Sequence, residues 1–329
     1  MISIEERIER ANRPVEARLR RIFQGGKRPF EVYGLLSQFM GLSGKRLRPA
    51  LCLACCQAVG GKPRQALAAA VAIEMFHNFT LIHDDIEDDS ILRRGKPCLH
   101  IKYGLPLALN AGDGLFMLVW REALGISGSR QNAVQRRLLD GFTKVLEGQA
   151  IELGWYNSNN WDVTEKQYYG VVSGKTGALI AASCEAGALL GGASLKTSKA
   201  LYDFGMGIGI AFQIIDDALN IVGDEKKYRK EIGGDIREGK RTLITIWALK
   251  MLAPEKRGRL ERLLKKKRKR DSDVREIIVL LKQSGAVDAA VKRAQGIVDR
   301  SLSKLSALRP GPHREFLNDL GRYITHRQR

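Results

Sequence analysis

Two clusters of acidic residues carry the strongest chemical signal in this sequence. The first places five carboxylates within six positions, from Asp84 to Asp89, directly after an apolar run with helical spacing. On a helix, Asp84 and Asp88 lie one turn apart on the same face, where their like charges repel unless a cation neutralises them. A solvated helix end explains the cluster poorly, because acidic side chains at a helix C-terminus oppose the helix dipole. Oxygen-only ligands favour a hard cation, and Mg²⁺ is the simplest choice.

The second acidic cluster is Asp216-Asp217, near the end of another apolar helical stretch. Asp216 shares a helix face with Asn220. Two such clusters, each at the end of a buried helix, can face one another across a cavity. Because Mg²⁺ held by one or two carboxylates normally keeps water ligands and binds substrate phosphates, the pattern predicts a phosphorylated ligand between the clusters.

Basic residues that suit a phosphate accompany the acidic clusters. Arginine offers paired hydrogen bonds to phosphate oxygens, and lysine offers a point charge. Each of these cations is ordinary surface background by itself, but their occurrence together with two acidic clusters indicates a phosphate-binding site. The candidates are Lys45, Arg48, Arg93, Arg94, Lys175, Lys230 and Lys240.

The elements that must position these residues are helices. Apolar residues recur at spacings of three and four over 66–86, 134–153 and 202–222, and alternating β-branched runs are missing. The sequence therefore predicts an all-α fold with about ten or more helices. Glycine and proline mark the breaks between helices, and no break is long enough for an interdomain linker. We therefore expect a single domain over residues 1–329.

These motifs, taken in order, resemble those of the trans-isoprenyl diphosphate synthases, the polyprenyl synthetase family. The resemblance covers the chain from about Arg18 to Arg329. A single DDxxD motif would be weak support, whereas the ordered set is specific. The resemblance implies the isoprenoid synthase fold, a helical bundle around a central cavity, usually in a homodimer. The matching segments are KRLRP at 45–49, DDIED at 84–88 with RRG at 93–95, Gly148-Gln149, Lys175-Thr176-Gly177, FQIIDD at 212–217 and GKRT at 239–242.

The resemblance also implies a reaction. In this family an allylic diphosphate ionises, isopentenyl diphosphate attacks the cation head to tail, and a proton is lost. Departure of diphosphate creates charge that metal ions and cationic side chains must stabilise in a dry cavity. The family implies on the order of three Mg²⁺ ions per site with substrate bound, bridging carboxylates to the diphosphate.

The resemblance assigns roles by position. By this assignment Asp84, Asp88 and Asp216 hold Mg²⁺, and Asp85 and Asp217 support them. The substrate ligands are Arg93, Lys175, Lys230 and Lys240 for the allylic diphosphate, Lys45, Arg48, His77 and Arg94 for isopentenyl diphosphate, and the oxygens of Thr176 and Gln213 for the developing carbocation. One departure is Asn220, where the family commonly has a third aspartate. We expect the loss of this charge to have little effect on activity.

Residues just before the first acidic motif limit the hydrocarbon pocket in this family. The fifth residue before Asp84 is the large Phe79, and the fourth is the small Thr80. This combination resembles synthases that make the C20 product, geranylgeranyl diphosphate. The alternative is the C15 product, farnesyl diphosphate, because Phe76 is also bulky. A plain helical wheel places Phe76 and Thr80 nearer the Asp84 face than Phe79.

The charge balance is strongly basic. The chain has 329 residues, with 55 basic and 36 acidic side chains and a formal net charge of +19. Ten basic residues and one acid lie between Lys256 and Arg270, so about half of the excess sits in one stretch. The run from Lys265 to Arg270 predicts a solvated helix end followed by an N-cap. Contact of this run with an anionic membrane surface or RNA is the alternative.

Cysteine usage and the N-terminus predict a cytoplasmic location. The five cysteines are odd in number and have no regular spacing, which favours a reducing compartment. Cys52, Cys55 and Cys56 lie in an apolar helical segment, which predicts small apolar side chains in the core. The first ten residues are charged and offer no signal-peptide core. The stretch from Thr176 to Leu195 is the most apolar, but it is rich in small residues and contains Glu185, so it predicts a buried helix.

Three other functions deserve comparison with the synthase. A class I terpene cyclase also uses an aspartate-rich motif and Mg²⁺, but it has no need of Lys45, Arg48 and Arg94. A non-catalytic subunit of a heteromeric synthase usually lacks one acidic motif, and here both are present. A nucleic-acid-binding role rests on the net charge alone.

Overall fold

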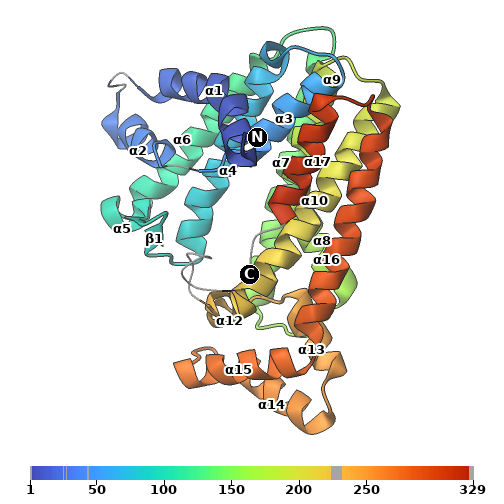
Figure 1. Ribbon diagram of the computed structural model, residues 1–329. Coiled ribbons are helices and arrows are strands. Elements are labelled where there is room, and N and C mark those ends of the chain that lie inside the picture. The colour runs from blue at the N-terminus through green and yellow to red at the C-terminus, as the bar shows by residue number, and fades with distance from the viewer. Residues whose placement is uncertain (1, 25, 27, 43, 224–231, 326–329) are drawn as a thin grey trace. The chain divides into compact units, whose positions relative to one another are not determined.

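The computed structural model describes residues 2–24, 26, 28–42, 44–223 and 232–325, and within them the protein is built from helices (Figure 1). The strands of this described part are the two-residue β1 (Leu92–Arg93) and β2 (Lys96–Pro97), which pair antiparallel. The predicted all-α fold is confirmed.

The chain divides into two compact units, which are described separately. Unit 1 comprises Met1–Phe142, Leu179–Tyr202 and Leu305–Leu320, and unit 2 comprises Thr143–Ala178, Asp203–Lys304 and Gly321–Arg329. The expectation of a single domain stays a prediction.

Unit 1 contains α1 (Ile4–Phe23), α2 (Phe30–Met40), α3 (Leu47–Ala58), α4 (Pro63–Glu87), α5 (Leu99–Tyr103) and α6 (Leu105–Leu124) and most of α9 (Ala178–Leu190). Unit 2 contains α8 (Glu165–Val172), the π-helical turn η1 (Ser173–Gly177), α12 (Gly234–Glu238), α13 (Leu243–Met251), α14 (Pro254–Leu264), α15 (Asp271–Gln283) and α16 (Ala286–Ser303). The helices α7 (Gln131–Asn157), α10 (Leu195–Val222) and α17 (Pro312–Thr325) contribute residues to both units, and the short η2 (Lys304–Ala307) follows α16.

Helix α4 is the central element of unit 1. It packs along α3 and α6, as Figure 1 shows, and it begins with Pro63 in its first turn, where a missing N–H costs nothing. Its first half is rich in buried alanines, including Ala66, Ala69 and Ala70, which allow close approach of neighbouring helices. The acidic cluster therefore follows a rigid, buried helix.

A buried ion pair ties four helices of unit 1 together. Arg46 adopts a left-handed backbone conformation (φ 46°) just before α3 and turns its guanidinium inward. Its Nη1 lies 2.7 Å from Oε1 of Glu74 on α4, and its Nε lies 2.8 Å from Oε1 of Glu16 on α1. Its Nη2 donates to the carbonyl of Met40 at the end of α2, at 3.0 Å. The charges of Glu74 and Glu16 raise the pKa of Arg46 in spite of its burial.

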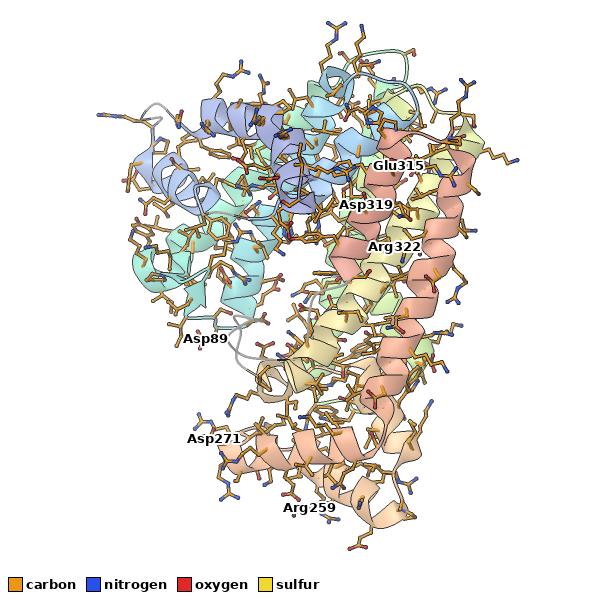
Figure 2. The ribbon with its side chains drawn as sticks, in the orientation of Figure 1. Asp89, Arg259, Asp271, Glu315, Asp319 and Arg322 are labelled. Atoms are coloured by element: carbon orange, nitrogen blue, oxygen red, sulfur yellow. The ribbon has the colours of Figure 1, made fainter. Side chains whose placement is uncertain are left out.

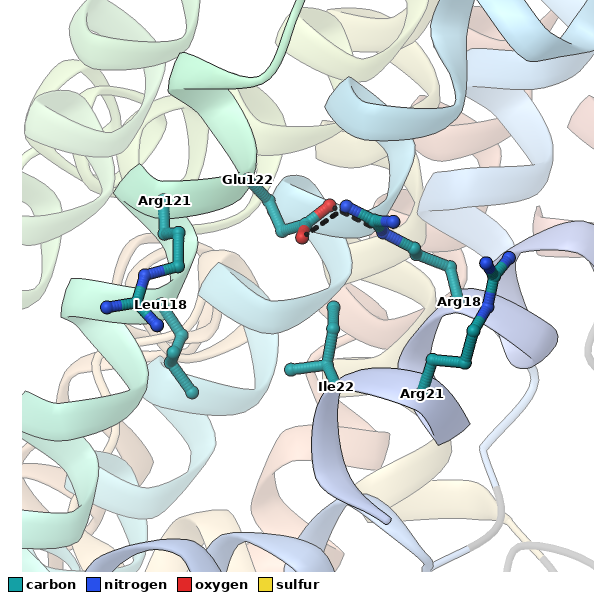
Figure 3. Close-up of a pocket in the computed structure, with 6 residues that line it drawn as sticks. All are labelled: Arg18, Arg21, Ile22, Leu118, Arg121 and Glu122. Atoms are coloured by element: carbon teal, nitrogen blue, oxygen red, sulfur yellow. Dashed lines mark hydrogen bonds and ion pairs between the residues drawn. The ribbon is translucent and has the colours of Figure 1, made fainter. Parts of the chain in front are cut away.

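Helix α1 is also held against α6. Figure 3 shows Arg18 of α1 facing Glu122 of α6, with Nε and Nη2 of the guanidinium 3.2 and 3.0 Å from the two carboxylate oxygens. The pair borders a pocket of about 200 Å³ that Arg21, Ile22, Leu118 and Arg121 also line. This two-point contact fixes the orientation of α1.

The cysteines lie where the sequence predicts. All five are free thiols in buried positions. Gly187 of α9 allows a close approach to Cys52 of α3, because a Cβ at this glycine would lie 1.9 Å from the Cys52 carbonyl oxygen. The predicted role of Cys52, Cys55 and Cys56 as small apolar core residues is confirmed.

The helices predicted from apolar spacing are all present and are longer than predicted. The ranges 66–86, 134–153 and 202–222 fall inside α4, α7 and α10. Both α4 and α10 are long and apolar enough to cross a membrane, but 67% and 56% of their most apolar windows are buried, as in core helices. The apolar stretch from Thr176 corresponds to the end of η1 and the buried α9.

Candidate functional site

The first acidic cluster lies at the C-terminal end of α4. The helix ends at Glu87, and the N–H of its C-cap, Asp88, donates to the carbonyl of Asp84 at 2.9 Å. Asp84 and Asp88 are both partly exposed, and Asp89, labelled in Figure 2, is fully exposed beyond the helix. The last turn contains no basic residue. The predicted carboxylate pair, one turn apart at the unfavourable end of the helix dipole, is therefore present.

The neighbouring carboxylate of Asp85 points into the protein instead. It is 1% exposed, and Arg93 donates to its Oδ1 from Nε at 2.7 Å and also from Nη2. Burial alone would lower the pKa of Arg93, but the hydrogen bond and charge of Asp85 raise it. The β1–β2 hairpin delivers Arg93, with Arg94 and Gly95 in left-handed conformations at its turn (φ 53° and 77°). Asp85 thus fixes the position of Arg93.

A cationic cluster surrounds His77 on α4. Burial, followed by the charges of Arg48, Arg94, Arg46 and Arg93, lowers the pKa of His77 well below its usual value. The imidazole is therefore neutral at neutral pH and can donate one hydrogen bond and accept another. The structure brings Arg48, Arg93 and Arg94 close enough for their charges to act on His77, as expected for an anion-binding site.

The segment before α3 contributes to the same cationic cluster. Arg94 donates from Nη1 to the carbonyl of Leu42 at 2.9 Å, and its guanidinium packs against Gly44, where a Cβ would lie 2.8 Å from Nη2. Lys45 follows Gly44 and is exposed. Glycine at position 44 therefore provides the space that Arg94 occupies beside Lys45.

The second acidic cluster, in unit 2, repeats the arrangement of one partly exposed and one buried carboxylate. Asp216 is partly exposed, whereas Asp217 is 4% exposed and accepts hydrogen bonds from Tyr168 Oη at 3.0 Å and Gln213 Nε2 at 2.8 Å. Burial and then the charge of Asp235 raise the pKa of Asp217 to about 7, against the opposing effect of the two hydrogen bonds.

The hydrogen bond to Asp217 also orients Gln213. Because its amide nitrogen donates to Asp217, the amide oxygen of Gln213 is directed to Thr176, whose hydroxyl donates to it at 2.9 Å. The predicted pair of oxygens, Thr176 and Gln213, is therefore brought together in unit 2. Two oxygen dipoles held in this way can stabilise positive charge on a bound hydrocarbon.

Both predicted lysines of the described part of unit 2 are held by carboxylates. Lys175 Nζ lies 2.7 Å from Glu152 Oε2. Lys240 Nζ lies 2.7 Å from Asp235 Oδ1 and 2.9 Å from Glu238 Oε2, and these charges raise its pKa in spite of burial. Lys230 lies outside the described residues. Sequence reasoning missed the carboxylate partners, because no local pattern indicates them.

The π-helical turn that presents Lys175 was also missed. Gly148 of α7 and Gly174 of η1 face one another closely, because a Cβ at Gly148 would lie 2.6 Å from the Lys175 nitrogen and one at Gly174 would lie 2.7 Å from the Lys144 carbonyl oxygen. The sequence signal that could have indicated this turn is Gly174, directly before Lys175, together with Gly148. Single π-helical turns occur often at functional sites because they re-aim one side chain.

The departure at Asn220 has a structural explanation. Asn220 is 2% exposed, its side-chain oxygen accepts the Asp235 N–H at 3.1 Å, and its carbonyl accepts the Gly233 N–H at 2.8 Å. The residue therefore ties α10 to the start of α12, which places the carboxylate that holds Lys240. The side-chain amide accepts the Asp235 N–H without adding a negative charge to this helix.

An aromatic cluster lies on α4 before the first acidic cluster. The ring of Phe76 stacks on Phe142 of α7 with centroids 3.9 Å apart, and Phe79 contacts Phe116 of α6 at 5.1 Å and His83 at 4.5 Å. Phe76 is fully buried, Phe79 is 7% exposed and Thr80 is more exposed, with its hydroxyl bonded to the His77 carbonyl at 2.8 Å. Phe79 and Thr80 are therefore more accessible than Phe76. Sequence reasoning did not identify Phe116 or Phe142.

The donor set fits Mg²⁺ shared with a phosphorylated ligand. Within the described part of the chain, no group of three or more His, Cys, Asp or Glu side chains gathers as a metal site. Mg²⁺ needs no such cage, because it commonly binds one or two carboxylates together with waters and substrate phosphates. Asp84 and Asp88 in unit 1, and Asp216 in unit 2, supply carboxylates of this kind. The predicted meeting of the two clusters stays a prediction.

Comparison with known proteins decides the family. The profile of the Polyprenyl synthetase family matches residues 31–281. This chain belongs to the polyprenyl synthetase family. A short chain isoprenyl diphosphate synthase of Methanothermobacter thermautotrophicus is 39% identical over 87% of each chain. A geranylfarnesyl diphosphate synthase of Aeropyrum pernix is 36% identical over 91% of this chain and 95% of that protein.

Solved structures of polyprenyl synthetases agree with this membership. The geranylgeranyl pyrophosphate synthetase of Pyrococcus horikoshii has a TM-score of 0.92 and 34% sequence identity, over 99% of this chain and 98% of that one. The resemblance inferred from the motifs is confirmed.

The neutral state of His77 leads to a pH-dependent stability. Because the pKa of His77 is lowered in the folded protein, its contribution to stability is present above the unfolded-state pKa of about 6.5 and is lost as pH falls below it. The free energy of unfolding should fall by up to about 1.4 kcal/mol per pH unit below pH 6.5, and His77→Gln should lack this component. Urea denaturation between pH 5 and 8 measures it. His313→Gln, which removes an exposed histidine of α17, is the control, and parallel curves for wild type and His77→Gln would contradict the assignment.

Proposed function

We propose that this protein is a Mg²⁺-dependent synthase that joins isopentenyl diphosphate head to tail to allylic diphosphates and makes geranylgeranyl diphosphate, a C20 product. The observation that carries the proposal is the presence of both acidic clusters and the cationic cluster around His77 in one chain of this family. A terpene cyclase has no need of Arg48 and Arg94, and a non-catalytic subunit usually lacks one acidic cluster.

The residues of unit 1 suit the binding of diphosphates. Asp84 and Asp88 hold Mg²⁺, which when bound neutralises negative charge on the departing diphosphate. Arg93, fixed by Asp85, contacts the allylic diphosphate. Lys45, Arg48 and Arg94 bind isopentenyl diphosphate, and the neutral His77 donates a hydrogen bond to the same group.

The residues of unit 2 suit the ionisation step. The allylic C–O bond breaks, diphosphate leaves with the electron pair, the double bond of isopentenyl diphosphate forms the new C–C bond, and a proton is lost. Lys175 and Lys240, oriented by Glu152 and Asp235, bind the leaving diphosphate, and Asp216 adds a carboxylate for Mg²⁺. Thr176 and Gln213 direct their oxygens to the carbocation, where charge develops.

Support for the C20 product comes from the α4 side chains and from the likeness to the geranylgeranyl pyrophosphate synthetase of Pyrococcus horikoshii. Phe79 is large and slightly exposed, Thr80 is small and more exposed, and Phe76 is withdrawn into its stack on Phe142. Phe79 is therefore the aromatic side chain of α4 best placed to stop a growing chain. A bulky stop at Phe76 would give the C15 product.

We also propose that the enzyme is cytoplasmic, because all five of its cysteines are free thiols, as in a reducing compartment. Cell fractionation tests this assignment, and recovery in an oxidising compartment would contradict it.

The proposed reaction makes a direct prediction. Purified protein with Mg²⁺, labelled isopentenyl diphosphate and either dimethylallyl, geranyl or farnesyl diphosphate should give a dominant C20 alcohol after phosphatase treatment, sized by chromatography. Asp84→Ala should lower the rate by about a hundredfold or more, because charge on the leaving group loses its stabilisation. Equal traces from wild type and Asp84→Ala with every primer would contradict the synthase and favour the non-catalytic subunit.

The floor of the hydrocarbon pocket gives a second prediction. Phe79→Ala should shift the main product from C20 to C25 or longer, because it removes the large, slightly exposed ring that contacts Phe116. Phe76→Ala is the comparison, and it should chiefly lower the free energy of unfolding by about 3–5 kcal/mol through the loss of a buried stack. An unchanged product length in Phe79→Ala would remove the floor assignment from this residue.

A homodimer is the third prediction. Leu105, Leu109, Met117 and Leu124 form an exposed apolar stripe along α6, 43–70% exposed, which suits a second copy of this chain. Light scattering should give twice 36.6 kDa. Met117→Glu should shift the mass to that of a monomer, whereas Leu195→Glu, at a still more exposed leucine of α10, should leave the dimer intact. A monomeric wild type would contradict the proposal.

A further inference from the structure

One surface of unit 2 carries positive charge that has no role in the proposed condensation reaction. The cationic loop, residues 265–270, joins α14 to α15 and contains six basic residues in succession. Figure 2 labels Arg259 on α14 and Asp271 at the start of α15, the two helices that carry the loop. The loop is largely exposed and ends at Arg270, the N-cap of α15. The predicted exposed helix end is therefore a loop between two helices instead, and the N-cap is the last residue of the basic run rather than a residue after it.

The acids of α15 compensate only part of this charge. Glu276 pairs with Arg259 through both oxygens, at 2.6 and 2.8 Å. Asp273 accepts from Lys266 Nζ at 2.7 Å and from the Arg270 N–H at 3.0 Å. Lys265, Lys267 and Arg268 are exposed and form no ion pair with any described residue. These three charges are therefore available to an external anion.

A pocket with a mixed lining lies beside the cationic loop. It has a volume of about 490 Å³ and lies between the 159–163 segment, α13 and α14. Ile246, Leu249 and Leu264 provide apolar lining, Trp161 provides an aromatic face, and polar and charged side chains, Lys265 among them, provide the rest. The pocket therefore places apolar and aromatic side chains next to the charge of the loop.

Two further cations of this surface lie over the ring of Trp161. The Arg241 guanidinium carbon lies 4.3 Å from the Trp161 ring centroid, and Lys269 Nζ lies 5.8 Å from it. Arg241 donates to the backbone carbonyls of Trp155 and Asn160, at 2.9 and 2.7 Å. Burial, and then the charge of Arg241, lower the pKa of Lys269, against the opposing charge of Asp273. Arg241 and Lys269 therefore add positive charge around Trp161 to that of the loop.

We propose that the cationic loop and the Trp161 pocket dock this protein on an anionic lipid membrane. Lipid phosphates would meet Lys265, Lys267 and Arg268, and the ring of Trp161 would lie at the depth of the headgroups, where tryptophan is favoured. The advantage of docking for product release rests on the proposed function. A C20 diphosphate combines a hydrocarbon tail with a charged head and partitions into such a membrane. Docking would shorten the path of the product from enzyme to bilayer.

A membrane explains this surface better than a nucleic acid. Single-stranded nucleic acid is bound by successive aromatic rings along a basic groove, and this surface offers one tryptophan. Exposed cations beside a tryptophan and apolar side chains instead match the order of charge and hydrocarbon at a bilayer surface.

The test is vesicle co-sedimentation of the full-length protein without substrates, so its result is independent of catalysis. Vesicles of phosphatidylglycerol mixed with phosphatidylcholine are compared with pure phosphatidylcholine, at low and high salt. The triple variant Lys265→Gln/Lys267→Gln/Arg268→Gln removes the exposed charges of the loop. Lys292→Gln/Arg300→Gln/Lys304→Gln, which removes three exposed cations of α16 and η2, is the charge-matched control.

We expect the wild type to bind the anionic vesicles, to release them at high salt and to ignore the neutral ones. A cation near an anionic surface strengthens binding about fivefold, so the loop variant should lose about a hundredfold while the control loses far less. Equal losses in both variants, or no binding of wild type to anionic vesicles, would overturn the proposal. Loop-dependent binding to random duplex DNA that is tighter than vesicle binding would overturn it in favour of a nucleic-acid surface. Far-UV circular dichroism and thermal unfolding confirm that both variants are folded.

Discussion

The buried ion pair between Arg46 and Glu74 is the constraint on which the binding surface of unit 1 depends. Two charges removed from water are stable together, but either one alone would be costly, so the pair forces α1, α2, α3 and α4 into one arrangement. Arg46 turns inward, while its neighbours Lys45 and Arg48 remain outside the pair. Asn78 donates to Glu74 Oε1 at 2.9 Å and completes this interaction one residue beyond His77. The arrangement that positions the predicted phosphate ligands is therefore itself held by an arginine and a glutamate without a catalytic assignment.

In each acidic cluster, two adjacent aspartates have different environments and different roles. Consecutive helical residues point about 100° apart, so one carboxylate can reach solvent while the next is buried. Asp85 is buried against Arg93, and Asp217 is buried against Tyr168 and Gln213. In both cases the buried carboxylate fixes a neighbouring side chain that has a predicted role with substrate. This division explains why a doubled aspartate is useful at each position, although only the partly exposed member is suited to a metal ion.

The features predicted from the sequence are those that depend on local pattern. Apolar spacing identified α4, α7 and α10, and the DDxxD spacing placed Asp84 and Asp88 on one face of α4. Contacts between residues distant in sequence were beyond such reasoning. Nothing near Lys175 indicates Glu152, and nothing near Phe76 indicates Phe142, because these partners meet only through helix packing. The role of Asn220 was likewise hidden, because its hydrogen bond to Asp235 spans a loop.

The net charge of +19 takes different forms in different parts of the chain. Arg93, Lys175 and Lys240 are each held by a carboxylate, which fixes their geometry and lowers the local positive charge. A cation oriented in this way can contact a diphosphate without the entropy cost of ordering a long side chain, and it does not oppose release as strongly as an uncompensated one. The exposed cations of the 265–270 loop are Lys265, Lys267 and Arg268, and no carboxylate of the described residues orients them. Their attraction for an anion depends on their number instead. A surface that must recognise many similar lipid headgroups needs charge density, whereas a site that must direct one bond cleavage needs fixed directions.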